Sequence, residues 1–414
     1  MKVFSTLFTF GIIILMSQQV YGQIAVAEKK VDWLIQPGAY RAELKQSNND
    51  IVLDNGLIRR SFRMLENLVC FDYSNLTNGQ QLLRAIEPEA IININGTDYE
   101  IGGLKGQKEK AYLLTEWLIG FRSNPDAFKY KKSKEVSLES NFNKNSIFWS
   151  SGDDMPKGKA LVMEFEQNSL PGIIVEIHYE IYDGLPVLRK WVEVRNESSS
   201  TIQVNRVVNE VLSLVEGESA VVGDPESMDK QSGIYFETNY AFNNAMKYRL
   251  SDQTLHWETD SSYTSQVNYD LRTPVKALVY PKDVSNIELL TNQKFTSVKT
   301  FELLHDSHDH ERRGLAIRKL YRKLAPWTNA NPIFMHLVSK NREDVITAID
   351  QCAATGYEAV ILSFGSHLRM ELNTPENHKE WKSLADYAKS KGIKLGGYTL
   401  FSSRTINAFP FWDL

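Results

Sequence analysis

The segment IIVEIHYEIYDGLPVLRKWVEVRN, residues 173–196, predicts two β-strands joined by a turn. Apolar and polar side chains alternate along its first half, with Val175, Ile177, Tyr179 and Ile181 on one face and Glu176, His178 and Glu180 on the other. This two-residue period is typical of a strand that has one face in a hydrophobic core. Asp183-Gly184 supplies a turn, after which Leu188, Val192 and Val194 continue the pattern. The segment therefore predicts an antiparallel hairpin.

The same alternation extends in both directions, from about Val31 to Phe301. Asp54-Asn55-Gly56 and Asn95-Gly96 are further hairpin signals within it. Many short strands in succession, without amphipathic helices between them, are typical of a large antiparallel sandwich. We therefore predict a β-sandwich (supersandwich) domain over residues 23–301.

The pattern changes after Glu302. Residues 311–324 carry apolar side chains at three- and four-residue spacing and are followed by Pro326, which predicts a linker helix within residues 302–331. From Asn331 onward, strands and helices alternate. The expected strands are 333–338, 359–364 and 393–401; the expected helices follow the cap residues Asn341 and Thr374 and end near Gly356 and Gly392. Their expected buried faces are Val345, Ile349 and Cys352 in the first helix, and Trp381, Leu384, Ala385 and Ala388 in the second.

Strands joined by crossover helices form a parallel sheet. Residues 332–414 therefore predict the first three β strands of a (β/α)8 TIM-type barrel, although a doubly wound sheet begins in the same way. A complete barrel takes ~250 residues, far more than this segment supplies. We therefore expect the chain to be a fragment of a longer reading frame or a frameshifted product, rather than a short protein in its own right.

The N-terminus has the pattern of a signal peptide. Lys2 is followed by an apolar run to Met16 that is too short to span a bilayer, and small residues precede a cleavage point before Gln23. We expect residues 1–22 to direct export to the periplasm or the medium and the mature chain to have no membrane anchor. The chain has 47 Lys and Arg residues against 51 Asp and Glu residues, and its sequence contains no dense basic stripe. This charge balance argues against nucleic acid as a partner.

The two cysteines, Cys70 and Cys352, lie in segments assigned to different domains. Two distant cysteines do not make a disulfide framework, so we expect both to be buried free thiols.

Two long segments carry a resemblance to a known family. They are FELLHDSHDHERRGLAIRKLYRKLAPWTNANPIFMHLVSKNREDVITAIDQCAATGYEAVILSFGS, residues 301–366, and LADYAKSKGIKLGGYTLFSSRT, residues 384–405. Together with YDGLPVLRKWVEVRN in the sandwich, they resemble the α-galactosidase (melibiase) clan, close to glycoside hydrolase family 36. The resemblance implies an exported enzyme that cleaves terminal α-linked galactose from oligo- or polysaccharides with retention of configuration. No cofactor is implied.

The resemblance also implies where the catalytic groups lie. In this clan the nucleophile is an Asp at the end of the fourth barrel strand and the acid/base is an Asp at the end of the sixth. Neither strand is present here, so we expect no catalytic residue within this chain and both carboxylates beyond Leu414. The alternatives are a non-catalytic carbohydrate-binding protein that uses the β-sandwich, and a half-barrel completed by another chain.

Candidate substrate-binding residues lie at the carboxyl ends of the barrel strands, where the loops of this fold build the active-site face. They are His336, Glu371, Tyr398, Ser402 and Arg404. Glu371 lies in a loop position where the related sequences also carry an acid, although a surface carboxylate is an equally good interpretation.

The tract His305-Asp-Ser-His-Asp-His310 is dense in potential metal ligands. A short histidine-rich tract is only a compositional hint of metal binding. Its acids also suit the N-terminus of the helix that follows. We therefore predict a polar helix start here and no metal.

Overall fold

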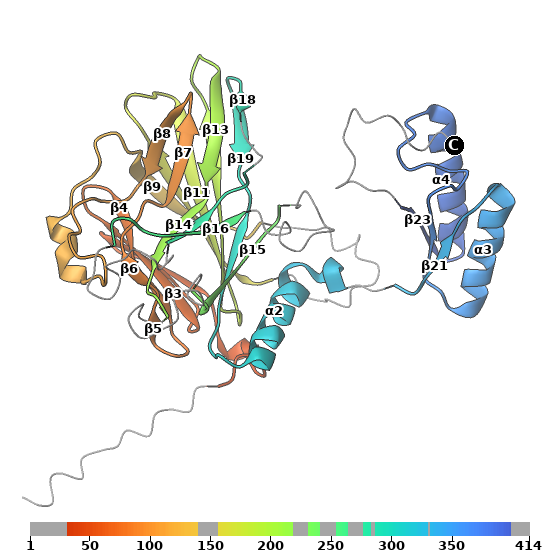
Figure 1. The fold of residues 1–414 in the computed structure, drawn as a ribbon, viewed down its shortest axis with the longest axis horizontal. Coiled ribbons are helices and arrows are strands. Elements are labelled where there is room, and N and C mark those ends of the chain that lie inside the picture. Colours follow the sequence, from red (N-terminus) through yellow and green to blue (C-terminus); the bar gives the residue numbers. More distant parts are fainter. Residues whose placement is uncertain are drawn as a thin grey trace, which may run out of the picture.

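The computed structural model describes residues 31–139, 156–217, 231–240, 254–263, 276–282, 286–329 and 332–398. Figure 1 shows a β-rich part followed along the chain by helix α2 and a small α/β part. The proposed signal peptide, residues 1–22, lies outside the described residues. Among those described, no helix is both long and apolar enough to cross a bilayer.

The β-rich part is built from antiparallel sheets, as predicted. A five-stranded sheet contains β1 (Glu43–Gln46), β2 (Asp50–Asp54), β3 (Ile58–Met64), β4 (Leu68–Asn75) and β5 (Gln80–Gln81). A seven-stranded sheet contains β9 (Lys129–Val136), β10 (Gly158–Glu166), β11 (Ile173–Tyr182), β12 (Val187–Asn196), β15 (Ile234–Thr238), β19 (Gln293–Thr296) and β20 (Thr300–Leu304). The order of the seven-stranded sheet is β15-β20-β12-β11-β10-β9, with β19 also paired to β12.

Two four-stranded sheets complete this part. One has the order β18-β13-β7-β8, with β7 (Ala90–Ile94), β8 (Thr97–Ile101), β13 (Ile202–Val208) and β18 (Ile287–Leu289). The other has the order β16-β17-β14-β6, with β6 (Leu83–Ala85), β14 (Glu210–Leu214), β16 (Leu255–Glu258) and β17 (Lys276–Val279). Short 3-10 helices occur at η1 (Pro37–Ala39) and η2 (Thr115–Gly120).

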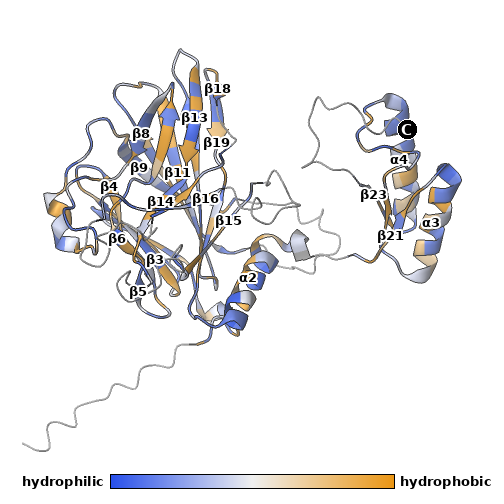
Figure 2. Ribbon diagram, viewed as in Figure 1, coloured by the Kyte–Doolittle hydropathy of each residue, from blue (hydrophilic) through white to orange (hydrophobic). Residues whose placement is uncertain are grey.

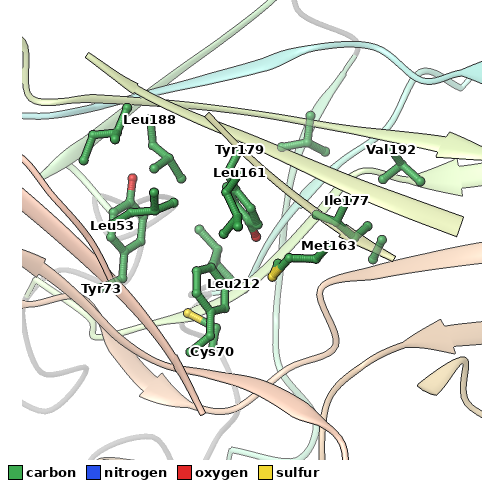
Figure 3. Close-up of a cluster of buried hydrophobic side chains, with 14 of the residues drawn as sticks. Leu53, Cys70, Tyr73, Leu161, Met163, Ile177, Tyr179, Leu188, Val192 and Leu212 are labelled. Atoms are coloured by element: carbon green, nitrogen blue, oxygen red, sulfur yellow. The ribbon is translucent and has the colours of Figure 1, made fainter. Parts of the chain in front are cut away.

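The hairpin predicted from residues 173–196 is present as β11 and β12, which pair in register from Ile173 with Asn196 to Ile181 with Leu188. Its apolar face is completely buried: Val175, Ile177, Tyr179 and Ile181 are all 0% exposed. Figure 3 shows Ile177 and Tyr179 in one cluster with Leu53 and Tyr73 from the five-stranded sheet. The two sheets therefore share a core, which is the sandwich arrangement expected from the alternation.

This core also contains a group of buried charges. Arg60 donates to both carboxylate oxygens of Glu210, at 2.9 and 3.2 Å, and Lys190 donates to Glu210 at 2.9 Å. Burial alone would raise the pKa of Glu210, but Arg60 and Lys190 hold it at about 2. Glu302 lies 3.4 Å from Arg60, and both its burial and the negative charge of Glu210 raise its pKa well above the usual range. The cluster therefore holds Glu210 as an anion and Glu302 as a neutral acid.

Helix α2 (His310–Leu324) begins where the sequence predicts and continues into a 3-10 turn, η5 (Pro326–Asn329). Its N-cap is Asp309, whose side chain accepts from the backbone N–H of Arg312. Asp306 accepts from the guanidinium of Arg312 and from the indole of Trp33. The acids of the 305–310 tract thus cap and anchor a helix, as predicted. Ala316, Leu320 and Leu324 of α2 belong to the hydrophobic cluster of the sandwich.

The α/β part contains three parallel strands in the order β21-β22-β23. Its elements are β21 (Phe334–Leu337), α3 (Arg342–Thr355), β22 (Ala359–Leu362), α4 (Pro375–Ser390) and β23 (Lys394–Gly397). Asn341 and Thr374 cap α3 and α4 with their side chains, and Gly356 ends α3 at a φ of 81°, all as predicted. Figure 2 shows hydrophilic and hydrophobic residues mixed along α3 and α4, as expected for helices with one buried face.

The predicted buried face of α4 is wrong at one residue. Leu384 and Ala388 are buried, but Ala385 is exposed and Tyr387 takes its place beside the core of this part. Tyr387 donates to the carboxylate of Asp350 on α3, so this side of α4 faces α3. Both helices pack with the sheet in one hydrophobic cluster that is separate from that of the sandwich. Three parallel strands begin either a barrel or a doubly wound sheet, so the barrel stays a prediction.

Cys70 and Cys352 are both free and buried, as predicted. Cys70 lies in β4 and Cys352 in α3, in two different hydrophobic clusters.

Candidate functional site

The carboxyl ends of β22 and β23 border a hollow of about 400 Å³. The segments 362–366 and 368–371, which follow β22, form most of its lining. Trp381 from α4, and Gly397 and Tyr398 from β23 and its end, complete it. The hollow therefore lies at the sheet edge where polar side chains of parallel α/β folds collect.

Gly397 allows the chain to pass close to Met370. A Cβ at this position would lie 2.3 Å from Cγ of Met370 and 3.2 Å from the ring of Trp381. Because the contact with Met370 is far inside van der Waals distance, a larger residue here would displace Met370 and reshape the hollow.

The structure brings three of the predicted residues together at this edge. Glu371 and Tyr398 both line the hollow. Tyr398 is 46% exposed and makes edge-to-face contacts with Phe364, at 4.6 Å between ring centroids, and with His336, at 6.0 Å. His336 lies in the exposed edge strand β21 and does not line the hollow. Ser402 and Arg404 lie outside the described residues.

The described lining of the hollow offers one carboxylate and one exposed aromatic ring. Glu371 can accept hydrogen bonds from hydroxyl groups, and the exposed ring of Tyr398 offers a flat apolar surface. Glu371 is the one carboxylate among the described residues that line the hollow. Retaining hydrolysis requires two carboxyl groups about 5 to 5.5 Å apart.

A second concentration of polar chemistry lies on the face of the seven-stranded sheet opposite the core. This outer polar face carries Lys132, Lys134, Glu164, Glu176, His178, Glu180, Arg189, Trp191, Glu193, Arg195, Lys294, Thr296 and Phe301. Although it is polar, several of its side chains are deeply buried, among them Glu180 and Arg189, each with a 1% exposed side chain.

Arg189 is the most enclosed cation of the outer polar face. Its guanidinium lies between the rings of Trp191 and Phe301, 4.8 and 5.3 Å from their centroids. It donates to Glu180 and to Glu139, both at 2.9 Å. Burial alone would lower the pKa of Arg189, but these carboxylates and a neighbouring tyrosine raise it. Arg189 therefore stays charged and fixes the carboxylates beside it.

The alternation predicts that Glu176, His178 and Glu180 share one face of the strand, but it does not predict which residues of the neighbouring strands lie beside them. Glu193 on β12 lies directly opposite Glu176, and Trp191 lies opposite His178. These partners depend on the register of the hairpin, which the turn at 183–186 sets. Asp183-Gly184 predicts a turn but not its length. The sequence therefore predicts which residues of β11 share a face, but not which residues of β12 lie opposite them.

No protein-family model matches the chain, and no curated protein matches it. Solved structures of α-galactosidases do match. They include the galactosidase domain of the α-galactosidase-sucrose kinase AgaSK, with 9% identity, TM-score 0.48, and coverage of 86% of this chain and 57% of that one.

Two further matches are of the same kind. The family 36 α-galactosidase AgaB from Geobacillus stearothermophilus has 11% identity and a TM-score of 0.47, over 86% of this chain and 56% of that one. The α-galactosidase from Lactobacillus brevis has 10% identity and a TM-score of 0.46, over 87% and 54%. This chain thus spans a little over half the length of these structures. All three are described as α-galactosidases, the clan that the sequence resembles, and their TM-scores are below 0.5.

Proposed function

We propose that this chain is the N-terminal part of an exported glycoside hydrolase of α-galactosidase type. Its substrates are oligo- or polysaccharides that end in α-linked galactose, and its two catalytic carboxylates lie beyond Leu414. One observation carries the proposal: Glu371 and Tyr398 border the same hollow at the carboxyl ends of parallel strands. The long sequence resemblance to family 36 supports the choice of sugar.

The residues have distinct roles in this proposal. Glu371 accepts hydrogen bonds from sugar hydroxyls, and Tyr398 contacts an apolar face of the ring. His336 supports Tyr398 through the contact between their rings. A charged acceptor for a hydroxyl contributes about 1.5 to 3 kcal/mol, which is enough to discriminate one epimer from another.

The first experiment measures sugar binding by the purified chain, since hydrolysis is not expected of it. Titration calorimetry or ligand-observed NMR should detect galactose and not its epimer glucose. The variant Glu371→Gln should weaken galactose binding about tenfold, or ~1.4 kcal/mol. Glu343→Gln is a matched control, because Glu343 is an exposed carboxylate in the first turn of α3 and does not line the hollow. Equal binding of both sugars, or no binding of galactose, would contradict the proposed role of the hollow.

The second experiment reads the nucleotide sequence beyond codon 414. We expect a homologous frame that encodes further β/α units, with an Asp at the ends of the fourth and sixth strands. A biological stop at that codon, with no homologous frame downstream, would count against this part of the proposal. Export through residues 1–22 is tested by N-terminal sequencing of the mature protein, which should begin at Gln23.

The alternative function, carbohydrate binding by the sandwich alone, requires aromatic rings that are open to solvent on a sheet face. Trp191, on the outer polar face, is 6% exposed and is covered by the ring of His178. The outer polar face therefore gives this alternative no specific support.

A further inference from the structure

Three potential metal ligands converge on the outer polar face, far along the chain from the 305–310 tract. Glu176 and His178 are two residues apart on β11 and so point to the same side, and Glu193 is the register partner of Glu176 on β12. One ligand atom from each of the three side chains lies within 4.8 Å of the others. Two neighbouring strands with fixed register therefore hold all three donors.

The carboxylates of this group are removed from solvent. Glu176 is 7% exposed and Glu193 is 9% exposed. Like charges placed directly opposite each other on adjacent strands are destabilising, and burial increases this effect. On their outer side they meet Lys294, 3.0 Å from Glu193, and Arg195, 3.6 Å from Glu176. Those two cations are 64% and 31% exposed, and Thr296 also donates to Glu193, at 3.3 Å.

His178 has an unsatisfied nitrogen that faces this group. Its ring stacks on Trp191, with 4.6 Å between the ring centroids and 15° between the planes, which fixes its orientation. Its Nε2 atom is inaccessible to solvent and has no hydrogen-bond partner among the described residues. The nearest carboxylate oxygen, on Glu176, is 3.6 Å away, which is long for a hydrogen bond but within the range of an ion pair if the ring is protonated. Buried nitrogens without a partner are rare in folded proteins, and a bound ion is one of the ways in which such an atom is satisfied.

Space for the remaining ligands of an ion is present. A hollow of about 390 Å³ lies over the cluster and includes all three residues in its lining. Val162, the register partner of His178 on β10, and Ala160 also line the hollow. The hollow therefore offers room beside the cluster for a further ligand of an ion.

We propose that Glu176, His178 and Glu193 bind a divalent transition-metal ion. One imidazole and two carboxylates suit Zn²⁺ or Mn²⁺, whereas Ca²⁺ and Mg²⁺ prefer oxygen ligands alone. Three protein ligands leave at least one coordination position for a molecule in the hollow. This proposal does not rest on the proposed hydrolase function, because the cluster lies in the sandwich and the sugar hollow lies in the α/β part.

The test is metal binding by the purified full chain after chelator treatment. Zn²⁺, Mn²⁺ and Ca²⁺ are titrated separately by calorimetry, and bound metal is counted after dialysis. We expect one Zn²⁺ or Mn²⁺ per chain and much weaker Ca²⁺ binding. His178→Ala and Glu193→Gln should each lower the affinity for the ion at least tenfold. Glu193→Gln preserves the shape of the side chain, so it still tests the proposal if His178→Ala does not fold.

The matched control is the double variant His308→Ala and His310→Ala, which removes two exposed histidines from the 305–310 tract. It should bind the ion as the unaltered chain does. A Co²⁺-loaded sample adds a spectroscopic readout, because removal of the imidazole nitrogen in His178→Ala should change its visible absorption. Absence of binding by the unaltered chain would overturn the proposal. So would loss of binding in the control variant while Glu193→Gln retains it.

Discussion

The buried charge cluster of the sandwich predicts different losses of stability for two chemically identical substitutions. Glu210 and Glu302 are both completely buried, and both lie within hydrogen-bond distance of Arg60. Glu210 is the anion of the pair and Glu302 the neutral acid. Replacing an ionised carboxylate with an amide removes a charge, whereas replacing a protonated one does not. Glu210→Gln should therefore be costly and Glu302→Gln nearly neutral.

The magnitude follows from the pKa of Glu210. Its lowering from 4.5 to about 2 corresponds to about 3 kcal/mol of stability at neutral pH. Removal of one partner from a buried ion pair costs about 3 to 5 kcal/mol, because Arg60 and Lys190 would keep their charges without a full counter-charge. For Glu302→Gln we expect a change of less than about 1 kcal/mol, since an amide has nearly the same shape and no charge.

The pH dependence has opposite signs for the two acids. Glu210 has a lowered pKa in the folded state, so its contribution is present above pH 4.5 and is lost as the pH falls toward about 2. Glu302 has a raised pKa, so its contribution is present below its ordinary value of 4.5 and is lost as the pH rises toward the folded pKa. The unaltered chain should therefore lose stability on acidification below pH 4.5, and Glu210→Gln should show a smaller acid loss.

The assay is urea denaturation followed by circular dichroism in the β-sheet region, at neutral pH and at several lower values. Glu210→Gln should lower the free energy of unfolding by about 3 kcal/mol at neutral pH. Equal losses for Glu210→Gln and Glu302→Gln would refute the assignment of one charged and one neutral acid. A larger loss for Glu302→Gln would show that the two are interchanged.

Three further predictions concern single positions. Gly184→Ala should lower the free energy of unfolding, measured by urea denaturation, by about 1 to 3 kcal/mol more than Gly79→Ala does. Both glycines have a positive φ, but a Cβ at Gly184 would lie 2.6 Å from the carbonyl oxygen of Pro37, whereas a Cβ at Gly79 would have no atom within 4 Å. Asn341→Ala should destabilise α3 by about 1 kcal/mol through loss of its cap, and Asn341→Ser should restore most of it, as measured by thermal denaturation. Cys70, whose pKa burial raises to about 12, should not react with a thiol reagent at about pH 8 until the chain is unfolded; fast labelling of the native chain would contradict its burial.

Local chemistry made part of this structure predictable. Asn341 and Thr374 are predictable as caps because a side-chain oxygen at a helix N-terminus accepts a hydrogen bond from a backbone N–H three residues further on. This interaction does not depend on the rest of the fold. The faces of β11 were predictable for the same reason, since alternation is a property of the strand itself. The prediction for Ala385 is wrong because the face that α4 buries depends on α3, where Tyr387 donates a hydrogen bond to Asp350.

The charged groups of the sandwich could not be predicted in this way. Arg60 and Glu210 come from strands β3 and β14, which are distant in sequence and meet only across the assembled core. A pattern in one segment cannot show that its arginine is buried against a carboxylate from another. The same holds for Glu193 opposite Glu176, where the register of one turn decides whether three donors meet. Both groups therefore depend on pairing between strands that are distant in sequence or on the register of a turn, and neither can be predicted from the pattern of one segment.

The two proposed sites use different residues, so an experiment can contradict one proposal without contradicting the other. The sugar hollow depends on Glu371 and Tyr398 in the α/β part, while the ion depends on Glu176, His178 and Glu193 in the sandwich. If both proposals hold, Glu193→Gln loses the ion and keeps galactose binding, and Glu371→Gln shows the reverse. If Glu193→Gln also loses galactose, then the sugar binds over the sandwich, the ion takes part in binding it, and the role proposed for the strand ends is wrong.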